Sequence, residues 1–223
     1  MISKYLKSKN TISQIFPTIN EEDLHDDTSS PFYDLKTFDQ SSTYYFYRNV
    51  FNNYEIGKIL SIFNKLPIKE ATLGSENRVD RSFRESSLSW VPINSQTNWI
   101  YQRLSEHINK ANESFFQYDL TKIEKLQFTR YFGNQKGFYA PHIDSNFGHF
   151  YENRKLTFVM QLSDPEDYEG GELRLHMSKD YDVMPKEKGL ITFFPSHILH
   201  ECTPVTSGTR CTLVGWVYGP KFK

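Results

Sequence analysis

The first half of the chain contains two stretches in which apolar residues recur at helical spacing. In the first stretch they are Ile56, Ile59, Leu60 and Phe63. The pair Asn52-Asn53 precedes this stretch as a helix-capping signal, and Pro67 follows it as a stop signal. In the second stretch they are Ile100, Leu104, Ile108, Ala111 and Phe115. Each pattern predicts an amphipathic helix whose apolar stripe packs on a sheet.

Short apolar runs separated by turn residues dominate the second half. The predicted strands cover 44–51, 126–131, 156–162, 172–175, 189–194, 200–205 and 210–218. Gly170-Gly171 is predicted to form a hairpin turn with positive φ angles, and a second turn is predicted at Ser207-Gly208. Strands of this length and spacing favour a sandwich or barrel, so we expect a mainly β fold with supporting helices.

The pattern of polar and apolar residues divides the chain into a short N-terminal part and a long remainder. Residues 1–43 are polar and aperiodic, with an acidic run at Glu21-Glu22-Asp23, and we expect them to form an N-terminal extension. Residues 44–223 are expected to form a single domain that is long enough for a sizeable core. Aromatic residues make up 16% of the chain, and aromatic side chains suit half-buried strands.

Charge and composition argue against several classes of partner. The formal net charge is -1, so the chain has no bulk basic field that would hold a nucleic acid. No apolar run is long enough to cross a membrane, and no apolar stretch typical of a secretory signal follows the first residues. Two cysteines, Cys202 and Cys211, do not make a disulfide framework. We therefore expect a cytoplasmic protein with no membrane or nucleic-acid partner.

The segment YAPHID, residues 139–144, carries the first candidate site. Residues i and i+2 of a strand point to the same face, and Pro141 favours extended geometry before it, so His142 and Asp144 are expected to project together. An imidazole and a carboxylate side by side can supply two ligands of a divalent metal. Taken alone, such a pair is more often a surface salt bridge or a strand-end turn, so a metal site also needs a third ligand from another strand.

Two histidines at the end of an apolar strand are candidates for that third ligand, His197 and His200. The other histidines are expected to be ordinary surface or strand residues, and they are His25, His107, His149 and His176. Two histidines and one carboxylate on one face of a metal form the facial triad of non-haem Fe(II) sites, which leaves three coordination positions open. Zinc prefers four-coordinate sites that often use cysteine, and a zinc site stays an alternative because both cysteines lie near the proposed ligands.

Arg210 is the candidate for binding an anion. The turn at 204–208 is predicted to pair its strand with that of His200 as a hairpin, which would place Arg210 beside His200 with Thr212 on the same face. No acidic residue lies within 209–218, and a buried arginine needs an anionic partner. A guanidinium matches a carboxylate through two parallel hydrogen bonds, so a bound dicarboxylate would satisfy it. A salt bridge to a distant Asp or Glu is the alternative.

Residues 126–218 resemble the catalytic core of the Fe(II)/2-oxoglutarate-dependent dioxygenases, specifically the prolyl 4-hydroxylase-like branch. Three segments carry the likeness: RYFGNQKGFYAPHID, RKLTFVMQLSDPEDYEGGELRL and GLITFFPSHILHECTPVTSGTRCTLVGW. They match the family's order of His-x-Asp, double glycine, Phe-Pro-Ser, histidine, Pro-Val and Gly-x-Arg, which is much more specific than His-x-Asp alone. The first half of the chain resembles the family only loosely, as helices that support the sheet.

The resemblance implies a fold and a metal centre. The family fold is a double-stranded β-helix, a distorted jelly roll with helices packed on one side. His142, Asp144 and His200 match the iron ligands. His200 is preferred to His197 because the residues that follow it match the family's phase up to Arg210.

The resemblance also implies a co-substrate site. Arg210 and Tyr131 match residues that bind the distal carboxylate of 2-oxoglutarate, and Thr212 is a weaker candidate for the same role. The implied cofactors are Fe(II), 2-oxoglutarate and O2, with ascorbate as a candidate reductant. The implied reaction couples oxidative decarboxylation of 2-oxoglutarate to hydroxylation of a C–H bond.

A prolyl residue in a peptide or protein is the leading substrate that the resemblance suggests. The alternatives are an oxygenase that acts on a small molecule or a non-prolyl side chain, and a non-catalytic binding module of the same fold. The polar stretch 76–92 is a candidate lid or peptide-binding loop, and a solvated connection is an equal alternative. Its candidate contact residues are Arg78, Arg81, Arg84 and Trp90.

Overall fold

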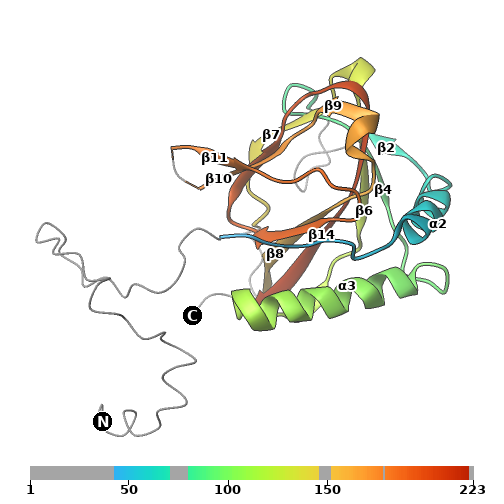
Figure 1. Ribbon diagram of the computed structural model, residues 1–223. Coiled ribbons are helices and arrows are strands. Elements are labelled where there is room, and N and C mark those ends of the chain that lie inside the picture. The colour runs from blue at the N-terminus through green and yellow to red at the C-terminus, as the bar shows by residue number, and fades with distance from the viewer. Residues whose placement is uncertain (1–42, 71–79, 146–151, 178, 221–223) are drawn as a thin grey trace, which may run out of the picture. The chain divides into compact units, whose positions relative to one another are not determined.

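Two helices form where the apolar stripes predict them. The computed structural model describes residues 43–70, 80–145, 152–177 and 179–220 (Figure 1). Helix α2 spans Asn53–Phe63, and helix α3 spans Asn98–Ala111 and continues into one π-helical turn, η3, at Asn112–Phe116. The predicted cap is confirmed, because the backbone N–H of Glu55 donates to the Asn52 side chain at 2.9 Å, and the Glu55 carboxylate accepts from the Asn52 backbone at 3.0 Å.

The larger of two antiparallel sheets contains nine strands. They are β1 (Tyr45–Tyr47), β2 (Lys69–Glu70), β4 (Ser87–Trp90), β5 (Lys122–Ile123), β6 (Gln127–Phe132), β8 (Glu152–Gln161), β9 (Tyr168–Gly170), β12 (Ile191–Pro195) and β14 (Val205–Pro220). The order is β1-β12-β8-β14-β6-β4-β2, and β5 and β9 also pair with β14. Two short 3-10 turns, η4 (Gly133–Gln135) and η5 (Pro165–Asp167), lie between strands.

The smaller sheet contains five strands in the order β11-β10-β13-β7-β3. They are β3 (Arg84–Glu85), β7 (Phe138–His142), β10 (Leu173–His176), β11 (Tyr181–Val183) and β13 (Leu199–Cys202). Together the two sheets confirm the predicted double-stranded β-helix with helices on one side.

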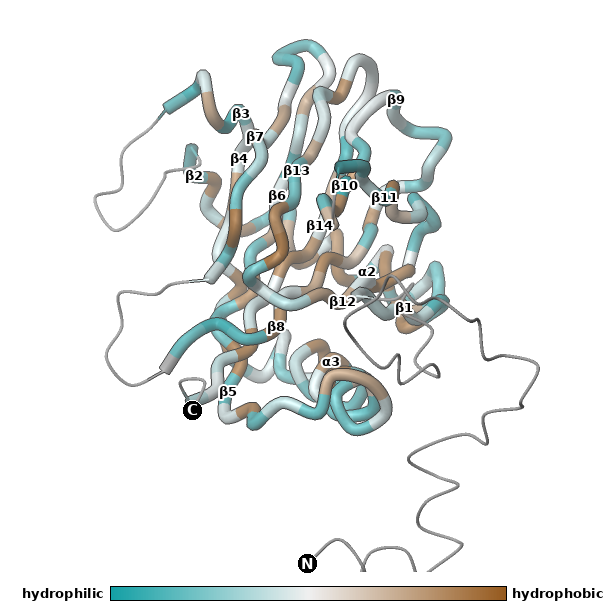
Figure 2. Tube along the Cα trace, turned by 90° about the vertical axis from the view of Figure 1, so that its left-hand side faces the viewer, coloured by the Kyte–Doolittle hydropathy of each residue, from teal (hydrophilic) through white to brown (hydrophobic). Residues whose placement is uncertain are grey.

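The main core lies between the helices and one face of the larger sheet. Figure 1 shows α3 running below the strands β8 and β14, and Figure 2 shows brown, apolar segments on the central strands. Phe63 of α2 contacts Phe128 of β6, with their ring centroids 5.2 Å apart, and Leu104 of α3 is fully buried in the same cluster. Because side chains alternate along a strand, the other face of this sheet is free to line the interior opposite the smaller sheet.

Two predicted hairpins are wrong. Gly170 and Gly171 have positive φ angles of 71° and 58°, as expected, but β9 before them pairs with β14 of the larger sheet while β10 after them belongs to the smaller sheet. Likewise β13 pairs with β10 and β7, whereas β14 lies in the larger sheet. Pro204 separates β13 from β14 and has no N–H to donate to a ladder, so the chain crosses between the sheets there.

The stretch 76–92 is only partly a connection. Residues 76–79 lie outside the described part of the chain, as do 1–42 and therefore the predicted extension. The prediction of a loop is wrong for 84–90, because β3 and β4 take this segment into the two sheets and bury Leu88. Within the described residues, no helix is long and apolar enough to cross a membrane.

Candidate metal and co-substrate site

Strand pairing brings the predicted metal ligands together. His142 at the end of β7 lies directly opposite His200 in β13, and residues that face each other across a ladder present their side chains to the same face. Asp144 follows two residues after the strand, where its backbone N–H and that of Ser145 donate to the Ser196 carbonyl at 2.9 Å. This turn points the Asp144 carboxylate back toward both imidazoles.

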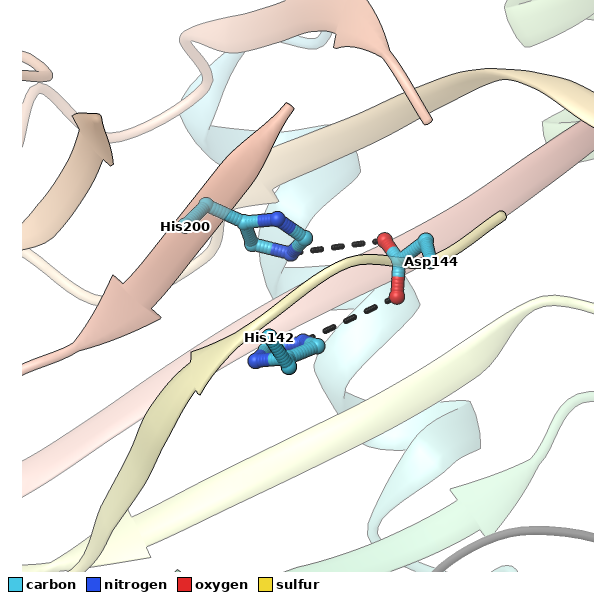
Figure 3. A group of neighbouring side chains, drawn as sticks. All are labelled: His142, Asp144 and His200. Carbon is cyan, nitrogen blue, oxygen red and sulfur yellow. Dashed lines mark ion pairs between the residues drawn. The ribbon is translucent and has the colours of Figure 1, made fainter. Parts of the chain in front are cut away.

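The three side chains converge within one small volume (Figure 3). The Asp144 Oδ1 atom is 3.7 Å from His142 Nε2, and Oδ2 is 3.4 Å from His200 Nε2. One candidate ligand atom from each residue lies within 4.8 Å of the others. Neither cysteine belongs to this group, so the zinc alternative gains no thiolate ligand here.

Backbone hydrogen bonds orient both imidazoles for metal binding. His142 Nδ1 lies 2.8 Å from the Ala140 carbonyl, and His200 Nδ1 lies 2.9 Å from the Ile198 carbonyl. A carbonyl oxygen can only accept, so each Nδ1 carries a hydrogen and donates it. In the neutral ring this leaves the lone pair on Nε2, the nitrogen that faces Asp144. Such a bond from the other ring nitrogen is the usual support of a metal-binding histidine.

The electrostatics of the cluster favour one carboxylate and one neutral imidazole. Burial, followed by the proximity of His200, lowers the pKa of His142 to about 3. Burial alone would raise the pKa of Asp144, but the two imidazoles outweigh it and hold this pKa far below its usual range. The pKa of His200 is raised, because the adjacent Asp144 outweighs the effect of burial. Thr157 of β8 supports the carboxylate, since its hydroxyl donates to Asp144 Oδ2 at 3.0 Å.

Arg210 lies deep in the interior with much of its hydrogen-bonding capacity unused. It is 2% exposed and sits in β14 directly opposite Tyr131 of β6. Its Nη1 donates to the Cys202 sulfur at 3.2 Å, whereas Nε and Nη2 have no hydrogen-bond partner among the described residues. Burial alone would lower the pKa of Arg210, but Cys202, Tyr131 and Tyr168 outweigh it and raise this pKa, so the side chain stays charged.

The prediction that Arg210 lies beside His200 in one sheet is wrong. The two residues belong to different sheets, and they meet through the interior, where Arg210 contacts Cys202, two residues after His200 in β13. The position still suits a dicarboxylate. One end would meet the Arg210 guanidinium from the larger sheet, and the other would reach the three ligands near the smaller sheet.

Further polar groups on the same face also lack partners. Thr212 lies two residues from Arg210 and faces Gln161 of β8 in the ladder. Thr212 Oγ1, Gln161 Oε1 and the Tyr168 hydroxyl are buried and have no hydrogen-bond partner among the described residues. Buried polar groups are normally paired, so these atoms and the Arg210 donors fit a polar ligand between the sheets. The donors around Arg210 match the chemistry of a carboxylate.

The sequence interpretation missed several residues of the site. The Tyr139 ring stacks on the His142 ring with centroids 3.5 Å apart, Cys202 accepts from Arg210, and Thr157 supports Asp144. Tyr139 and Cys202 could have been found, because they lie three residues before His142 and two residues after His200. Thr157 could not, because its contact depends on how consecutive strands of two different sheets face each other.

The remaining histidines lie away from the cluster where they are described. His197 is exposed, in agreement with the preference for His200. His176 of β10 lies 3.2 Å from Glu201 on the outer side of the smaller sheet, and the Nδ1 of His107 in α3 bonds to the Arg103 carbonyl. His25 and His149 fall outside the described residues.

Comparisons with known proteins agree with this geometry. The model of the 2OG-Fe(II) oxygenase superfamily matches residues 126–218. The PKHD-type hydroxylase of Gloeothece citriformis is 37% identical over 97 residues, which is 43% of each protein. The corresponding protein of Rippkaea orientalis is 33% identical over 98 residues, again 43% of each. The matched segment thus spans less than half the length of these relatives.

Solved structures resemble a larger part of the chain. A Trichoplax adhaerens prolyl hydroxylase, in complex with a hypoxia inducible factor peptide fragment, superposes with a TM-score of 0.67 at 18% identity, over 80% of this chain and 84% of that one. A Pseudomonas putida prolyl-4-hydroxylase gives 0.64 at 18% identity, over 79% and 93%. At this identity the likeness establishes the fold. Residues 126–218 therefore match the 2OG-Fe(II) oxygenase superfamily, and the described chain has a fold like that of the prolyl hydroxylases.

Proposed function

We propose that this chain is an Fe(II)- and 2-oxoglutarate-dependent oxygenase that hydroxylates a C–H bond, with a prolyl residue in a peptide or protein as its substrate. One observation carries the proposal. Two imidazoles and one carboxylate converge in the interior, and Arg210 faces the same interior with donors that are unpaired among the described residues. The names of the relatives support hydroxylation, and those of the structural neighbours support proline as the target.

Different side chains of the site would bind the metal and the co-substrate. His142 and His200 would each bind the metal through Nε2, and Asp144 would bind it through a carboxylate oxygen. Arg210 would bind the distal carboxylate of 2-oxoglutarate, with Tyr131 and Thr212 beside it. When bound, the ferrous ion, 2-oxoglutarate and O2 supply the oxidising chemistry, and the protein positions them and excludes water.

The ligand assignment is tested by single substitutions. His142→Ala, Asp144→Ala and His200→Ala should each abolish succinate formation from 2-oxoglutarate and lower the affinity for Zn(II), since each removes one of three ligands. His176→Ala is the matched control, because His176 is also a strand histidine beside a carboxylate and should leave both measurements unchanged. Turnover close to wild type in any of the three ligand variants would refute the assignment.

The substrate is tested by mass. The iron-loaded protein is incubated with 2-oxoglutarate and a panel of proline-containing peptides, and the products are mapped by fragmentation. A gain of one oxygen at proline supports prolyl hydroxylation. Oxygen at another side chain, or only in small molecules, would replace proline as the substrate. Metal and 2-oxoglutarate binding with no oxidised product from any substrate would favour a binding module.

A further inference from the structure

Arg84 is a second buried arginine, and neither the metal nor the co-substrate site uses it. It is 7% exposed and lies in β3 directly opposite Tyr139 of β7. Its Nε donates to Ser86 Oγ and its Nη2 to Gln127 Oε1, both at 2.9 Å. Both partners are neutral, and Arg84 forms no ion pair with any residue that the structure describes. A buried arginine without an anion is costly, and because this one faces the interior beside the metal cluster, it points to a bound anion.

The guanidinium lies beside the metal cluster. Its Cζ is 4.4 Å from the centroid of the Tyr139 ring, and that ring stacks on His142. Gln127 projects from β6 on the same face as Tyr131, because the two are four residues apart in one strand. The Arg84 side chain therefore bridges from the smaller sheet to the larger one within the interior.

An exposed tryptophan, Trp90, lies next to this position and beside a buried one, Trp216, over whose ring the Arg154 Cζ lies at 4.0 Å from the centroid. Trp90 of β4 lies opposite Gln127 in the ladder and is 37% exposed. Its ring contacts that of Trp216, with centroids 6.2 Å apart. Trp216 lies on the same face of β14 as Thr212, four residues away, and opposite Thr157 of β8, whose hydroxyl donates to Asp144. A molecule that rests on Trp90 would thus lie near Arg84, which bonds to Gln127 opposite Trp90, and near Trp216.

On the basis of the proposed function, the formal charges at the site show that Arg84 lacks an anionic partner. The two positive charges of Fe(II) and the one of Arg210 balance the single charge of Asp144 and the two of 2-oxoglutarate. With both groups in place, Arg84 keeps an unbalanced positive charge among the described residues around the site. Neither the metal nor the co-substrate therefore leaves a negative charge that could pair with Arg84.

We infer that Arg84 binds a carboxylate of the primary substrate. The substrate is therefore an acid: either a peptide with an acidic side chain next to the hydroxylated residue, or a molecule in which that residue carries a free carboxylate. The apolar part of the substrate rests on the exposed ring of Trp90. The inference rests on the proposed function and adds the substrate class to it.

Two pairs of probes that differ by one carboxylate test the inference. They are N-acetylproline against N-acetylprolinamide, and acetyl-Ala-Pro-Glu-amide against acetyl-Ala-Pro-Gln-amide. Binding is measured by NMR titration of the Zn(II)-loaded protein saturated with 2-oxoglutarate, so that no turnover is needed. The carboxylate member of at least one pair should bind about tenfold more tightly or better, as a charge-assisted fork predicts. The pair that shows the preference identifies the source of the carboxylate.

Three variants assign the preference to Arg84. Arg84→Gln should reduce the carboxylate member to the affinity of its amide and leave the amide unchanged. Arg84→Lys should keep part of the preference. Arg130→Gln is the matched control, because Arg130 is also buried and bonded to neutral Ser89, but it is adjacent to Tyr131 in β6 and so points to the opposite face. It should keep the full preference.

Several outcomes would overturn the inference. They are equal binding within both pairs, no binding of either carboxylate member, and a preference that survives Arg84→Gln. A loss of 2-oxoglutarate affinity in Arg84→Gln as large as that in Arg210→Gln would instead assign Arg84 to the co-substrate. If Arg84→Gln does not fold, the wild-type preference and Arg84→Lys decide. Failure of the wild type to bind metal and 2-oxoglutarate would refute the proposed function itself.

Discussion

Arg210 is the residue on which the proposed co-substrate site depends. Its guanidinium is buried with Nε and Nη2 unpaired among the described residues, and a carboxylate is the group that would pair them. Arg210→Gln should therefore weaken 2-oxoglutarate binding by roughly 2–5 kcal/mol, the usual effect of removing one partner from a desolvated charged pair. Calorimetry on the Zn(II)-loaded protein measures this, with Arg130→Gln as the control. An unchanged dissociation constant would show that another cation holds the acid.

Protonation of the metal cluster gives a second prediction at the residue scale. The pKa of His142 is lowered to about 3 and that of His200 is raised above 6.5, so near pH 6 only His200 carries an extra proton while Asp144 is ionised. Metal binding must displace that proton from Nε2. Zn(II) binding at this pH should therefore release about one proton, and the release should fall toward zero as the pH rises well past the pKa of His200.

Proton release is measured by calorimetry in buffers that differ in ionisation enthalpy. Asp144→Asn serves as a comparison, because it removes the carboxylate that raises the pKa of His200 and should lower the release near pH 6. Release of two protons by the wild type would mean that both imidazoles are charged before the metal binds. That result would contradict the assignment of His142 as the neutral member.

At the scale of elements, the turn between β9 and β10 packs closely against the Arg210 side chain. Gly171 has φ of +58°, and a Cβ there would lie 2.8 Å from Val205 Cγ2 and 2.9 Å from Arg210 Cδ. Gly171→Ala should therefore lower the free energy of unfolding by roughly 1–3 kcal/mol. It should also weaken 2-oxoglutarate binding, because the Arg210 stem has to move.

Gly57 provides the matched control within helix α2. A Cβ at Gly57 would meet nothing within 4 Å, so Gly57→Ala should stabilise the protein by roughly 0.5–1 kcal/mol through helix propensity. Thermal unfolding with and without 2-oxoglutarate measures both variants. Equal effects of the two substitutions would show that the close packing under Arg210 does not matter.

For the molecule as a whole, the site joins the two sheets. His142 and His200 come from the smaller sheet, while Arg210 comes from the larger one. A ligand that bridges them binds only the folded state. At 2-oxoglutarate concentrations about 100 times the dissociation constant, the metal-loaded protein should gain about 2.7 kcal/mol of stability, or roughly 5–10 °C in Tm.

The same experiment separates the two halves of the site. Arg210→Gln at equal concentrations should lose the increment from 2-oxoglutarate and keep the increment from Zn(II). Asp144→Ala should lose both, because the metal that Asp144 would hold is also expected to bind the keto acid end of 2-oxoglutarate. A full 2-oxoglutarate increment in Arg210→Gln would contradict the bridging arrangement.

The sequence by itself determined the local features of this protein. The spacing of residues along the chain explains the cap and apolar stripe of α2 and the strands around Phe128 and Phe158. It also explains why the side chains of His142 and Asp144 project together. Local periodicity fixes which side chains share a face, since a helix repeats every 3.6 residues and a strand every 2. The roles of the site residues remain predictions that the experiments above address.

Only the tertiary structure decided which strands became neighbours. Sequence spacing suggested one hairpin for His200 and Arg210, yet the chain crosses at Pro204 and sets them in two sheets that face each other. The tertiary structure also brought Thr157 of the larger sheet to Asp144, which follows a strand of the smaller sheet, and Arg84 to Tyr139. Such contacts depend on how the whole set of apolar faces is buried at once, and no local pattern carries that information.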